Sequence, residues 1–394
     1  VGSTIAPSQR DGNGSIWDTN TTGQGGINNN SFVALGPNGT ITAWGNATQG
    51  GAYAPTGTGY TQICASANSY AALKADGSIS AWGNSIYGTT DAPTGTGYTK
   101  IFSTAGAFAA LKTDGSVVTW GNTGFGNSNS PTGTGYTDIF TTSKSFAARK
   151  ADGSITSWGY SITGGTGAPV FTGYTSIAAT QQAFAALKAD GTIYAWGSTG
   201  FGSGPYMPLG GGYVQLYADG GAFTALRADG SLKSWGSTTY GGSLQPTGTG
   251  YVQVASAGFA FAALKADGSI SSWGRTEYGG GTDSPTGTGF TAISSNRQAF
   301  AALKSDGSIV TWGDSLAGGT NGTGVPTGTG YTRIVSNVNA FAALKADGSI
   351  SAWGNSANGG TGAPTGTGYT DISFNSSAFA AIKADGSITT WGLS

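Results

Sequence analysis

The chain has 394 residues, of which 72 are Gly and only 9% are charged, with a formal net charge of −1. Its 11 Trp, 17 Tyr and 17 Phe argue against disorder, because disordered chains lack the aromatic residues that bury a core. The absence of any basic run excludes a typical nucleic-acid partner, and no apolar run approaches the ~20 residues that membrane insertion needs.

Residues 1–30 form an irregular N-terminal segment. Its stretch "GSIWDTNTTGQGG" looks like a third strand and its outgoing loop, without the hairpin that should precede them. We expect this spare strand either to pair with the last repeat, to cap an edge, or to add to a neighbouring subunit. Trp17 lies within it and is a candidate subunit contact.

Residues 31–394 consist of ten repeats of about 38 residues. Each repeat is marked by one Trp-Gly pair, and these begin at Trp44, Trp82, Trp120, Trp158, Trp196, Trp235, Trp273, Trp312, Trp353 and Trp391. A fixed period in this range is typical of propellers, solenoids and arrays. The repeats therefore predict one architectural unit copied ten times.

Each repeat predicts three β-strands. In the third repeat, "YTKIFS" begins at Tyr98, "AFAALK" at Ala107 and "SVVTWGN" at Ser116, and each alternates with period two. The last two strands form a hairpin. The first repeat has Pro37 in its turn, which favours a three-residue loop, since Pro suits the first central position of a type I turn.

The three-residue loop sets the register of the hairpin. We expect Leu111 to face Val117 and Phe108 to face Trp120. One face of the sheet then carries Phe and Trp and the other carries Leu, Val and Ala, so both faces require cover. Blades stacked face to face supply that cover. The predicted fold class is all-β, a β-propeller of ten blades, with an open spiral of the same blades as the alternative.

The repeat also resembles a known family. "FAALKADGSISAWGN" is similar to the bacterial branch of RCC1-like propeller repeats, as in the β-lactamase-inhibitor protein II type, and to repeat tracts of giant bacterial surface proteins. The resemblance spans residues 31–392 and implies a propeller. The family ring usually has seven blades, whereas this chain has ten repeats. The family's His-containing positions are absent, so no site residue transfers.

Catalytic, metal-binding and cofactor-binding residues are not expected. The chain has no His and its only glutamate is Glu277, which excludes the Ser-His-Asp triad and imidazole ligands. Most Asp residues occupy the hairpin turns, where the carboxylate bonds nearby backbone N–H groups. We therefore expect a protein that is not an enzyme.

The variable loops are the candidate binding sites, because loops on rigid scaffolds usually carry binding. The candidate residues are Tyr87, Phe125, Phe201, Tyr206, Tyr240, Arg275, Glu277 and Tyr278. Arg149 replaces the Leu of other repeats and is expected either to reach an acid, to lie at an open edge, or to make a subunit contact.

Two functions are compatible with these features. The first is an extracellular or cell-surface structural or adhesive protein that associates with itself, with another surface protein or with a glycan. The second is a discrete binding module of the lectin or enzyme-inhibitor kind. We favour the first, because bulk geometry matters more than one special pocket in such a repetitive chain.

Overall fold

The computed structural model describes residues 28, 31–35, 38–204, 206–320, 322, 324–374 and 378–392. They fall into two compact units, an N-terminal unit that ends at Gly211 and a C-terminal unit that begins at Gly212. Trp17 and the expected spare strand lie outside the described residues. The choice between a ring and a spiral concerns both units together and stays a prediction.

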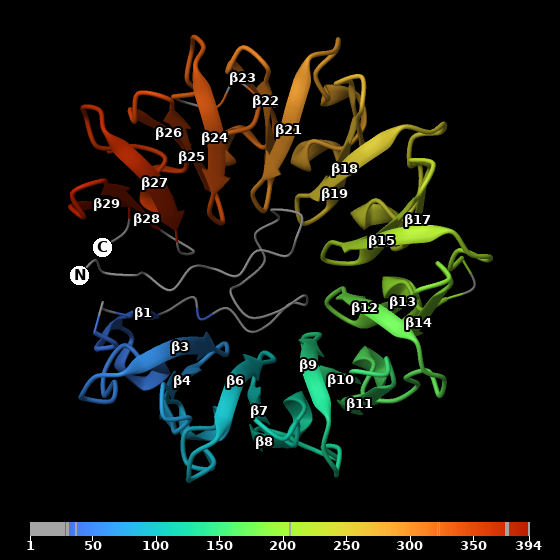
Figure 1. Ribbon diagram of the computed structural model, residues 1–394, viewed down its shortest axis with the longest axis vertical. Helices are drawn as coiled ribbons and strands as arrows, with labels where there is room; N and C mark the ends of the chain where they lie inside the picture. The colour runs from blue at the N-terminus through green and yellow to red at the C-terminus, as the bar shows by residue number, and fades with distance from the viewer. Residues whose placement is uncertain are drawn as a thin grey trace. The chain divides into compact units, whose positions relative to one another are not determined.

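The N-terminal unit consists of five antiparallel sheets, a two-stranded one followed by four of three strands (Figure 1). Its elements are β1 (Ser31–Leu35), β2 (Ile41–Gly45), η1 (Ala47–Gln49), β3 (Tyr60–Ala65), β4 (Ser69–Lys74), β5 (Ile79–Gly83), η2 (Ser85–Tyr87), β6 (Tyr98–Ser103), β7 (Ala107–Lys112), β8 (Val117–Gly121), η3 (Thr123–Phe125), β9 (Tyr136–Thr141), β10 (Ser145–Lys150), β11 (Ile155–Gly159), η4 (Ser161–Thr163), β12 (Tyr174–Ala179), β13 (Ala183–Lys188), β14 (Ile193–Gly197) and η5 (Thr199–Phe201).

The C-terminal unit consists of five three-stranded antiparallel sheets. Its elements are β15 (Tyr213–Ala218), β16 (Ala222–Arg227), β17 (Leu232–Gly236), η6 (Thr238–Tyr240), β18 (Tyr251–Ser256), β19 (Ala260–Lys265), β20 (Ile270–Gly274), η7 (Thr276–Tyr278), η8 (Gly281–Asp283), β21 (Phe290–Ser295), β22 (Ala299–Lys304), β23 (Ile309–Gly313), η9 (Ser315–Ala317), β24 (Tyr331–Ser336), β25 (Ala340–Lys345), β26 (Ile350–Gly354), η10 (Ser356–Asn358), β27 (Tyr369–Phe374), β28 (Ala378–Lys383) and β29 (Ile388–Gly392). The all-β class and the repeated three-stranded blade are confirmed.

The hairpin has the predicted register and turn. Leu111 pairs with Val117 and Phe108 pairs with Trp120. The Lys112 N–H donates to the Ser116 carbonyl at 2.9 Å, which leaves three residues in the loop, and Gly115 has a φ of 76°. That left-handed conformation is why Gly ends the turn in every hairpin.

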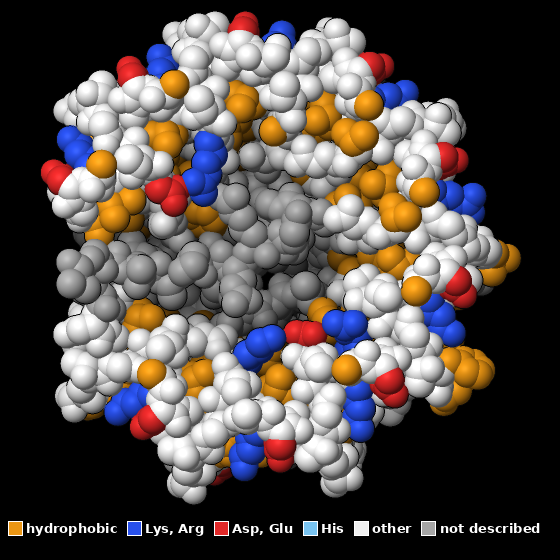
Figure 2. Space-filling model, viewed as in Figure 1, with side chains coloured by type: hydrophobic (Ala, Val, Ile, Leu, Met, Phe, Trp, Pro, Cys, Tyr) orange, Lys and Arg blue, Asp and Glu red, His pale blue; other side chains and the backbone are white. Residues whose placement is uncertain are grey.

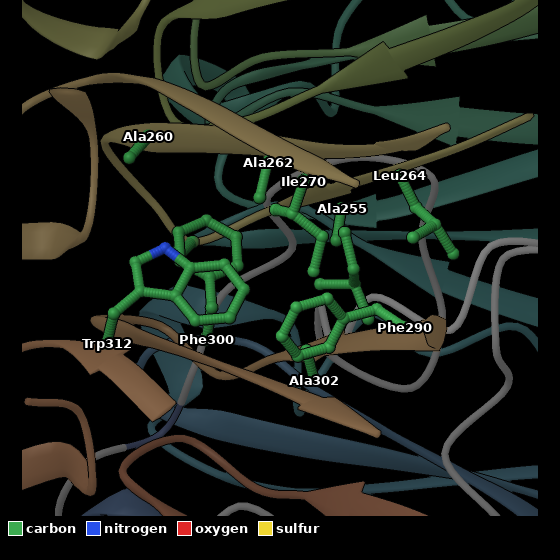
Figure 3. Close-up of a cluster of buried hydrophobic side chains, with 11 residues drawn as sticks. Ala255, Ala260, Ala262, Leu264, Ile270, Phe290, Phe300, Ala302 and Trp312 are labelled. Atoms are coloured by element: carbon green, nitrogen blue, oxygen red, sulfur yellow. The ribbon is translucent and has the colours of Figure 1, made fainter. Parts of the chain in front are cut away.

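Successive blades within a unit stack face to face. Figure 3 shows one such contact, between the blade β18–β20 and the blade β21–β23. Ala262, Leu264 and Ile270 of the first blade cover Phe300 and Trp312 of the second. The Phe and Trp rings are themselves stacked, with centroids 5.1 Å apart. The small Ala side chains allow this approach, so each blade buries the aromatic face of the next.

Most of the buried tryptophans also hydrogen bond to the preceding blade. The indole N–H donates to the carbonyl of the Gly that follows the preceding 3₁₀ helix, at 3.0–3.2 Å, in Trp82, Trp196, Trp273, Trp312, Trp353 and Trp391. In all six cases a second Gly follows that Gly in the sequence.

Trp120 and Trp158 differ from these six. Their indole nitrogens are buried and have no partner in the described part of the chain. Here Thr89 or Asn127 replaces the second Gly. Elsewhere this position is crowded, since a Cβ on Gly165 would lie 2.3 Å from the Gly159 carbonyl oxygen. In these two blades a side chain at this point therefore accompanies the loss of the indole hydrogen bond.

This difference gives a matched pair of substitutions within the N-terminal unit. Trp196→Phe removes a hydrogen bond and leaves the Gly164 carbonyl without it, whereas Trp158→Phe removes a donor that has no partner in the described chain. We expect Trp196→Phe to lower the free energy of unfolding by about 1 kcal/mol more than Trp158→Phe. Urea unfolding followed by far-UV circular dichroism measures both, and equal losses would contradict this account.

Candidate functional site: the variable edge of the blades

Each blade has two edges that differ in how they vary among repeats. The turn edge carries the Asp-Gly hairpin turn and, in most repeats, the Pro-Thr-Gly-Thr-Gly connection, which Val170, Phe171 and Leu209 interrupt in two repeats. At the opposite edge lie the loop before the second strand and the 3₁₀ helix after the third. The residue just before the second strand is Asn68, Gly106, Lys144, Gln182, Gly221, Phe259, Gln298 or Asn339. We call this opposite edge the variable edge.

Backbone hydrogen bonds build the variable edge. The Asn122 N–H donates to the Gly106 carbonyl at 3.0 Å, which joins the 3₁₀ helix to the loop of the same blade. The Asn122 side chain caps η3 by accepting from the Gly124 N–H at 2.9 Å. Between blades, the Ala105 N–H donates to the Ser143 carbonyl at 3.0 Å. The loops of neighbouring blades in the N-terminal unit are therefore joined along this edge.

Aromatic rings of the N-terminal unit line up along this edge. Tyr87 and Phe125 come from successive 3₁₀ helices, and their ring centroids lie 5.9 Å apart, with the backbone of Gly106 beside them. The next loop supplies Lys144, whose ammonium lies 4.9 Å from the Phe125 ring and 5.5 Å from the Tyr160 ring. In these two blades the loop residue thus packs beside aromatic rings that lie in, or next to, successive 3₁₀ helices.

The C-terminal unit has a tighter version of the same arrangement. The Phe259 ring stacks on Tyr240 with centroids 4.4 Å apart and lies tilted against Tyr278 with centroids 4.6 Å apart. The other side of Tyr240 lies against Gly221, where a Cβ would come within 2.7 Å of the ring. Arg275 lies 5.4 Å from the Tyr278 ring. Burial raises the pKa of Tyr240. The structure therefore joins predicted residues from two blades through Phe259.

Arg275 and Glu277 form an ion pair at 3.1 Å on the exposed side of this stack. Hydrogen bonding from its own backbone N–H, and then from Arg275, holds the pKa of the Glu277 carboxyl below its usual value. Both side chains are largely exposed, so the pair adds little stability but presents both charges to a partner.

A buried carboxyl group, that of Asp219, lies near Tyr240. Asp219 is 1% exposed, and its Oδ1 accepts from the Gly221 and Ala222 N–H groups at 2.8 and 2.7 Å. Its Oδ2 has no partner in the described chain. Burial raises the pKa of Asp219 well above its usual value.

In another blade, an asparagine occupies the position of Asp219 and makes a hydrogen bond that Oδ2 of Asp219 does not make. Asn296 likewise accepts from two N–H groups, and its amide donates to the Ala317 carbonyl, the last residue of η9, at 2.7 Å. The corresponding carbonyl in the Asp219 blade belongs to Tyr240, the last residue of η6. A carboxylate cannot donate, so only protonated Asp219 can reproduce this bond.

The remaining candidates lie elsewhere. Phe201 ends η5, and Tyr206 is 79% exposed in the connection that follows. Arg149 reaches an acid, which was one of its expected alternatives: it donates to Asp138 at 3.1 Å and to the Tyr174 carbonyl of the next blade at 3.3 Å. Its role as a subunit contact stays a prediction.

Asp138 accepts from two cations at this point. Lys100, from the preceding blade, lies 3.2 Å from it, opposite Arg149. Although burial would raise the pKa of the Asp138 carboxyl, hydrogen bonds from Lys100 and Arg149 and the charge of Lys100 hold it below its usual value. The replacement of Leu by Arg149 is thereby compensated within the chain.

The turn edge has repeated charges in a fixed pattern. Figure 2 shows blue and red side chains next to one another at several places. Lys112 lies 5.2 Å from the Tyr98 ring, and the Asp114 carboxylate accepts from Ser116. These hydrogen bonds, with a smaller contribution from Lys112, lower the pKa of Asp114. The near-identical copies in other blades indicate a structural role.

The described residues contain neither a cluster of metal-binding side chains nor a membrane-spanning helix. No group of three or more Cys, Asp or Glu side chains gathers closely enough there to hold a metal ion. No helix in the described chain is long and apolar enough to cross a membrane.

Comparison with known proteins gives likeness of fold at most. No protein-family model matches the chain, and no curated protein matches it. Similar solved structures include the ectodomain of the receptor kinase CR4 of Physcomitrella patens, with a TM-score of 0.40 and 19% identity over 64% of this chain and 71% of that one. The ACR4 ectodomain of Arabidopsis thaliana gives 0.38 and 20% over 64% and 95%. Prp20p of Saccharomyces cerevisiae, the yeast RCC1, gives 0.38 and 15% over 75% and 82%. Likeness at this level says nothing of function.

Sequence reasoning missed Lys144, Phe259 and Asp219. All three lie in the short loop between the first and second strands, for which no site was predicted. The signal was present, because repeats that agree elsewhere carry different residues at these positions.

Asp219 gives a pH-dependent prediction. Its pKa is raised on folding, so its contribution to stability is full below the ordinary Asp pKa and is lost as pH rises through the raised value. Asp219→Asn supplies a permanent donor and should stabilise the protein at pH 8 by about 1–3 kcal/mol, with the gain shrinking towards pH 4. Thermal and urea unfolding across this pH range measure the effect.

The reciprocal change is the control. Asn296→Asp should introduce the same loss of stability at high pH into a blade that lacks it. The charged and titratable groups near Tyr240 are Arg275, Arg297 and Tyr278, and all are unchanged in both variants. A pH-independent effect of Asp219→Asn would show that Asp219 is not protonated in the folded protein.

Proposed function

We propose that this chain is a non-enzymatic, extracellular adhesive protein that contacts surfaces or other copies of itself through the variable edge. The observation that carries the proposal is the concentration of variation: repeats that agree in the core and, apart from the connections that contain Val170, Phe171 and Leu209, on the turn edge differ at the variable edge. If the repeats served only to fill space, nothing would require their differences to gather on one edge.

The chemistry of the variable edge supports contact with a partner. Tyr240, Phe259, Tyr278 and Arg275 form a rigid cluster, and Tyr and Arg are the residue types that dominate binding hot spots. Aromatic side chains lose little conformational entropy on binding, and the stack has already fixed them. The extracellular location rests on the likeness of the repeats to those of bacterial surface proteins.

A discrete binding module is the second candidate. The tight stack of the C-terminal unit favours it, because one rigid cluster can serve as a single high-affinity site. The finer likeness to the bacterial branch of RCC1-like repeats, including the β-lactamase-inhibitor type, belongs with this candidate. It predicts saturable binding with one partner per chain, whereas an adhesive protein should bind in proportion to the surface offered.

The experiment compares the two edges of the C-terminal unit. The variable-edge variant Tyr240→Asn, Phe259→Asn, Arg275→Asn and Tyr278→Asn uses residues that other repeats carry at these positions, such as Asn339, Asn355 and Asn358. The control carries Lys265→Gln and Lys304→Gln on the turn edge. Adsorption to surfaces coated with chitin, mucin, polygalacturonate or the protein itself is measured by quartz-crystal microbalance.

We expect the variable-edge variant to adsorb at least about tenfold less to the preferred surface, because hot-spot truncations cost about 2 kcal/mol or more. The turn-edge control should adsorb like the original protein. Sedimentation velocity reports self-association separately. Adsorption that survives the variable-edge change, or that is lost with the turn-edge change, would refute the proposal.

A further inference from the structure

Between Asn46 and Phe201, the variable edge of the N-terminal unit carries a single charge. From Asn46 to Phe201, the residues of that edge are Asn, Gln, Ser, Thr, Gly, Ala, Ile, Tyr and Phe, apart from Lys144. No acid of the described chain forms an ion pair with Lys144. In contrast, Lys100 and Arg149 both reach Asp138.

Aromatic rings rather than a counter-ion surround this cation. The ammonium of Lys144 lies near Phe125 on one side and Tyr160 on the other, at 4.9 and 5.5 Å. Tyr160 is 43% exposed, so part of its ring is open to solvent beside the charge. Ring quadrupoles orient a cation without neutralising it, so Lys144 remains able to accept an anionic partner.

The frame around Lys144 is fixed by hydrogen bonds. The Tyr160 N–H donates to the Lys144 carbonyl at 3.1 Å, and the Ser145 hydroxyl donates to the Tyr160 carbonyl at 2.7 Å. On the next blade, the Gln181 carbonyl accepts from the Ser143 N–H at 2.9 Å. Gln181 and Gln182 therefore continue the edge from Lys144 with amide groups.

We propose that this edge binds an acidic polysaccharide whose sugars carry carboxylates, with Lys144 at a carboxylate and Tyr160 against the ring of a sugar. A uronate pyranose combines the three features the edge can match: a carboxylate for the ammonium, an apolar C–H face for an aromatic ring, and hydroxyls for amides. This inference rests on the proposed function and names the ligand class for the N-terminal unit.

An acidic peptide fits the edge less well. Recognition of acidic peptides relies on clustered cations, whereas Lys144 is the one charge on this edge between Asn46 and Phe201. The linear order of Tyr87, Phe125 and Tyr160 over three successive blades suits an extended polymer.

The test uses the full chain and three soluble polymers: polygalacturonate, poly-glutamate and dextran. Binding is measured by biolayer interferometry at low and at high salt. The original protein should bind polygalacturonate more tightly than poly-glutamate at equal carboxylate concentration, and should not bind dextran. Equal or tighter binding of poly-glutamate would overturn the proposal in favour of an acidic peptide.

Two variants test the contributions of the Lys144 charge and of the Tyr160 ring to binding separately. Lys144→Gln uses a residue that Gln182 and Gln298 carry at the same position, and should weaken polygalacturonate binding about tenfold and remove most of its salt dependence. Tyr160→Ser uses the residue that Ser198 and Ser237 place at the equivalent position, and should weaken binding with the salt dependence retained. Lys112→Gln on the turn edge is the matched control and should bind like the original protein.

Failure of this inference can be told apart from failure of the proposed function. Unchanged binding in Lys144→Gln, or no binding of polygalacturonate at all, overturns the ligand class. The C-terminal variable-edge variant still tests adhesion to the other coated surfaces. Unchanged circular dichroism melting of Lys144→Gln and Tyr160→Ser shows that a loss of binding does not come from unfolding.

Discussion

The structure depends on burying the aromatic face of each blade against its neighbour. A three-stranded sheet with Phe and Trp on one side and Leu and Ala on the other is too apolar on both sides to be stable alone. The side chains of Phe300 and Trp312 are at most 1% exposed because Ala262 and Leu264 of the preceding blade cover them. Fully burying side chains of this size contributes about 1.5–3 kcal/mol each. The core residues therefore recur, because each must fit the blade on either side.

Much of this fold follows from the sequence by local rules. Pro37 in the first repeat is enough to choose the three-residue turn, and the turn sets the pairing of Phe108 with Trp120. Two apolar faces then require stacking. Local rules could not predict which side chains of neighbouring blades come into contact along the variable edge. That Phe259 would lie between Tyr240 and Tyr278 depends on the offset between adjacent blades, which no single repeat encodes.

Residues that break a repeat proved informative in different ways. Arg149 occupies a Leu position and was noticed from the sequence, yet the chain neutralises it internally through Asp138. Lys144 breaks no pattern, because its position has no consensus, yet it stands among rings without an acid in the described chain. A residue that departs from the repeat consensus, as Arg149 does, requires a compensating partner in the chain. A position without a consensus, such as that of Lys144, can change without disturbing the repeat and can therefore be selected for binding.

Main-chain hydrogen bonds join neighbouring loops in the described part of the N-terminal unit. The bonds from Ala105 to Ser143 and from Ser143 to Gln181 form whatever side chains these residues carry. The side chains at these loop positions can therefore change without loss of the hydrogen bonds that join neighbouring blades. Point mutations in the gene, or recombination between its near-identical repeats, can therefore change the residues of the variable edge without disrupting the stacked blades.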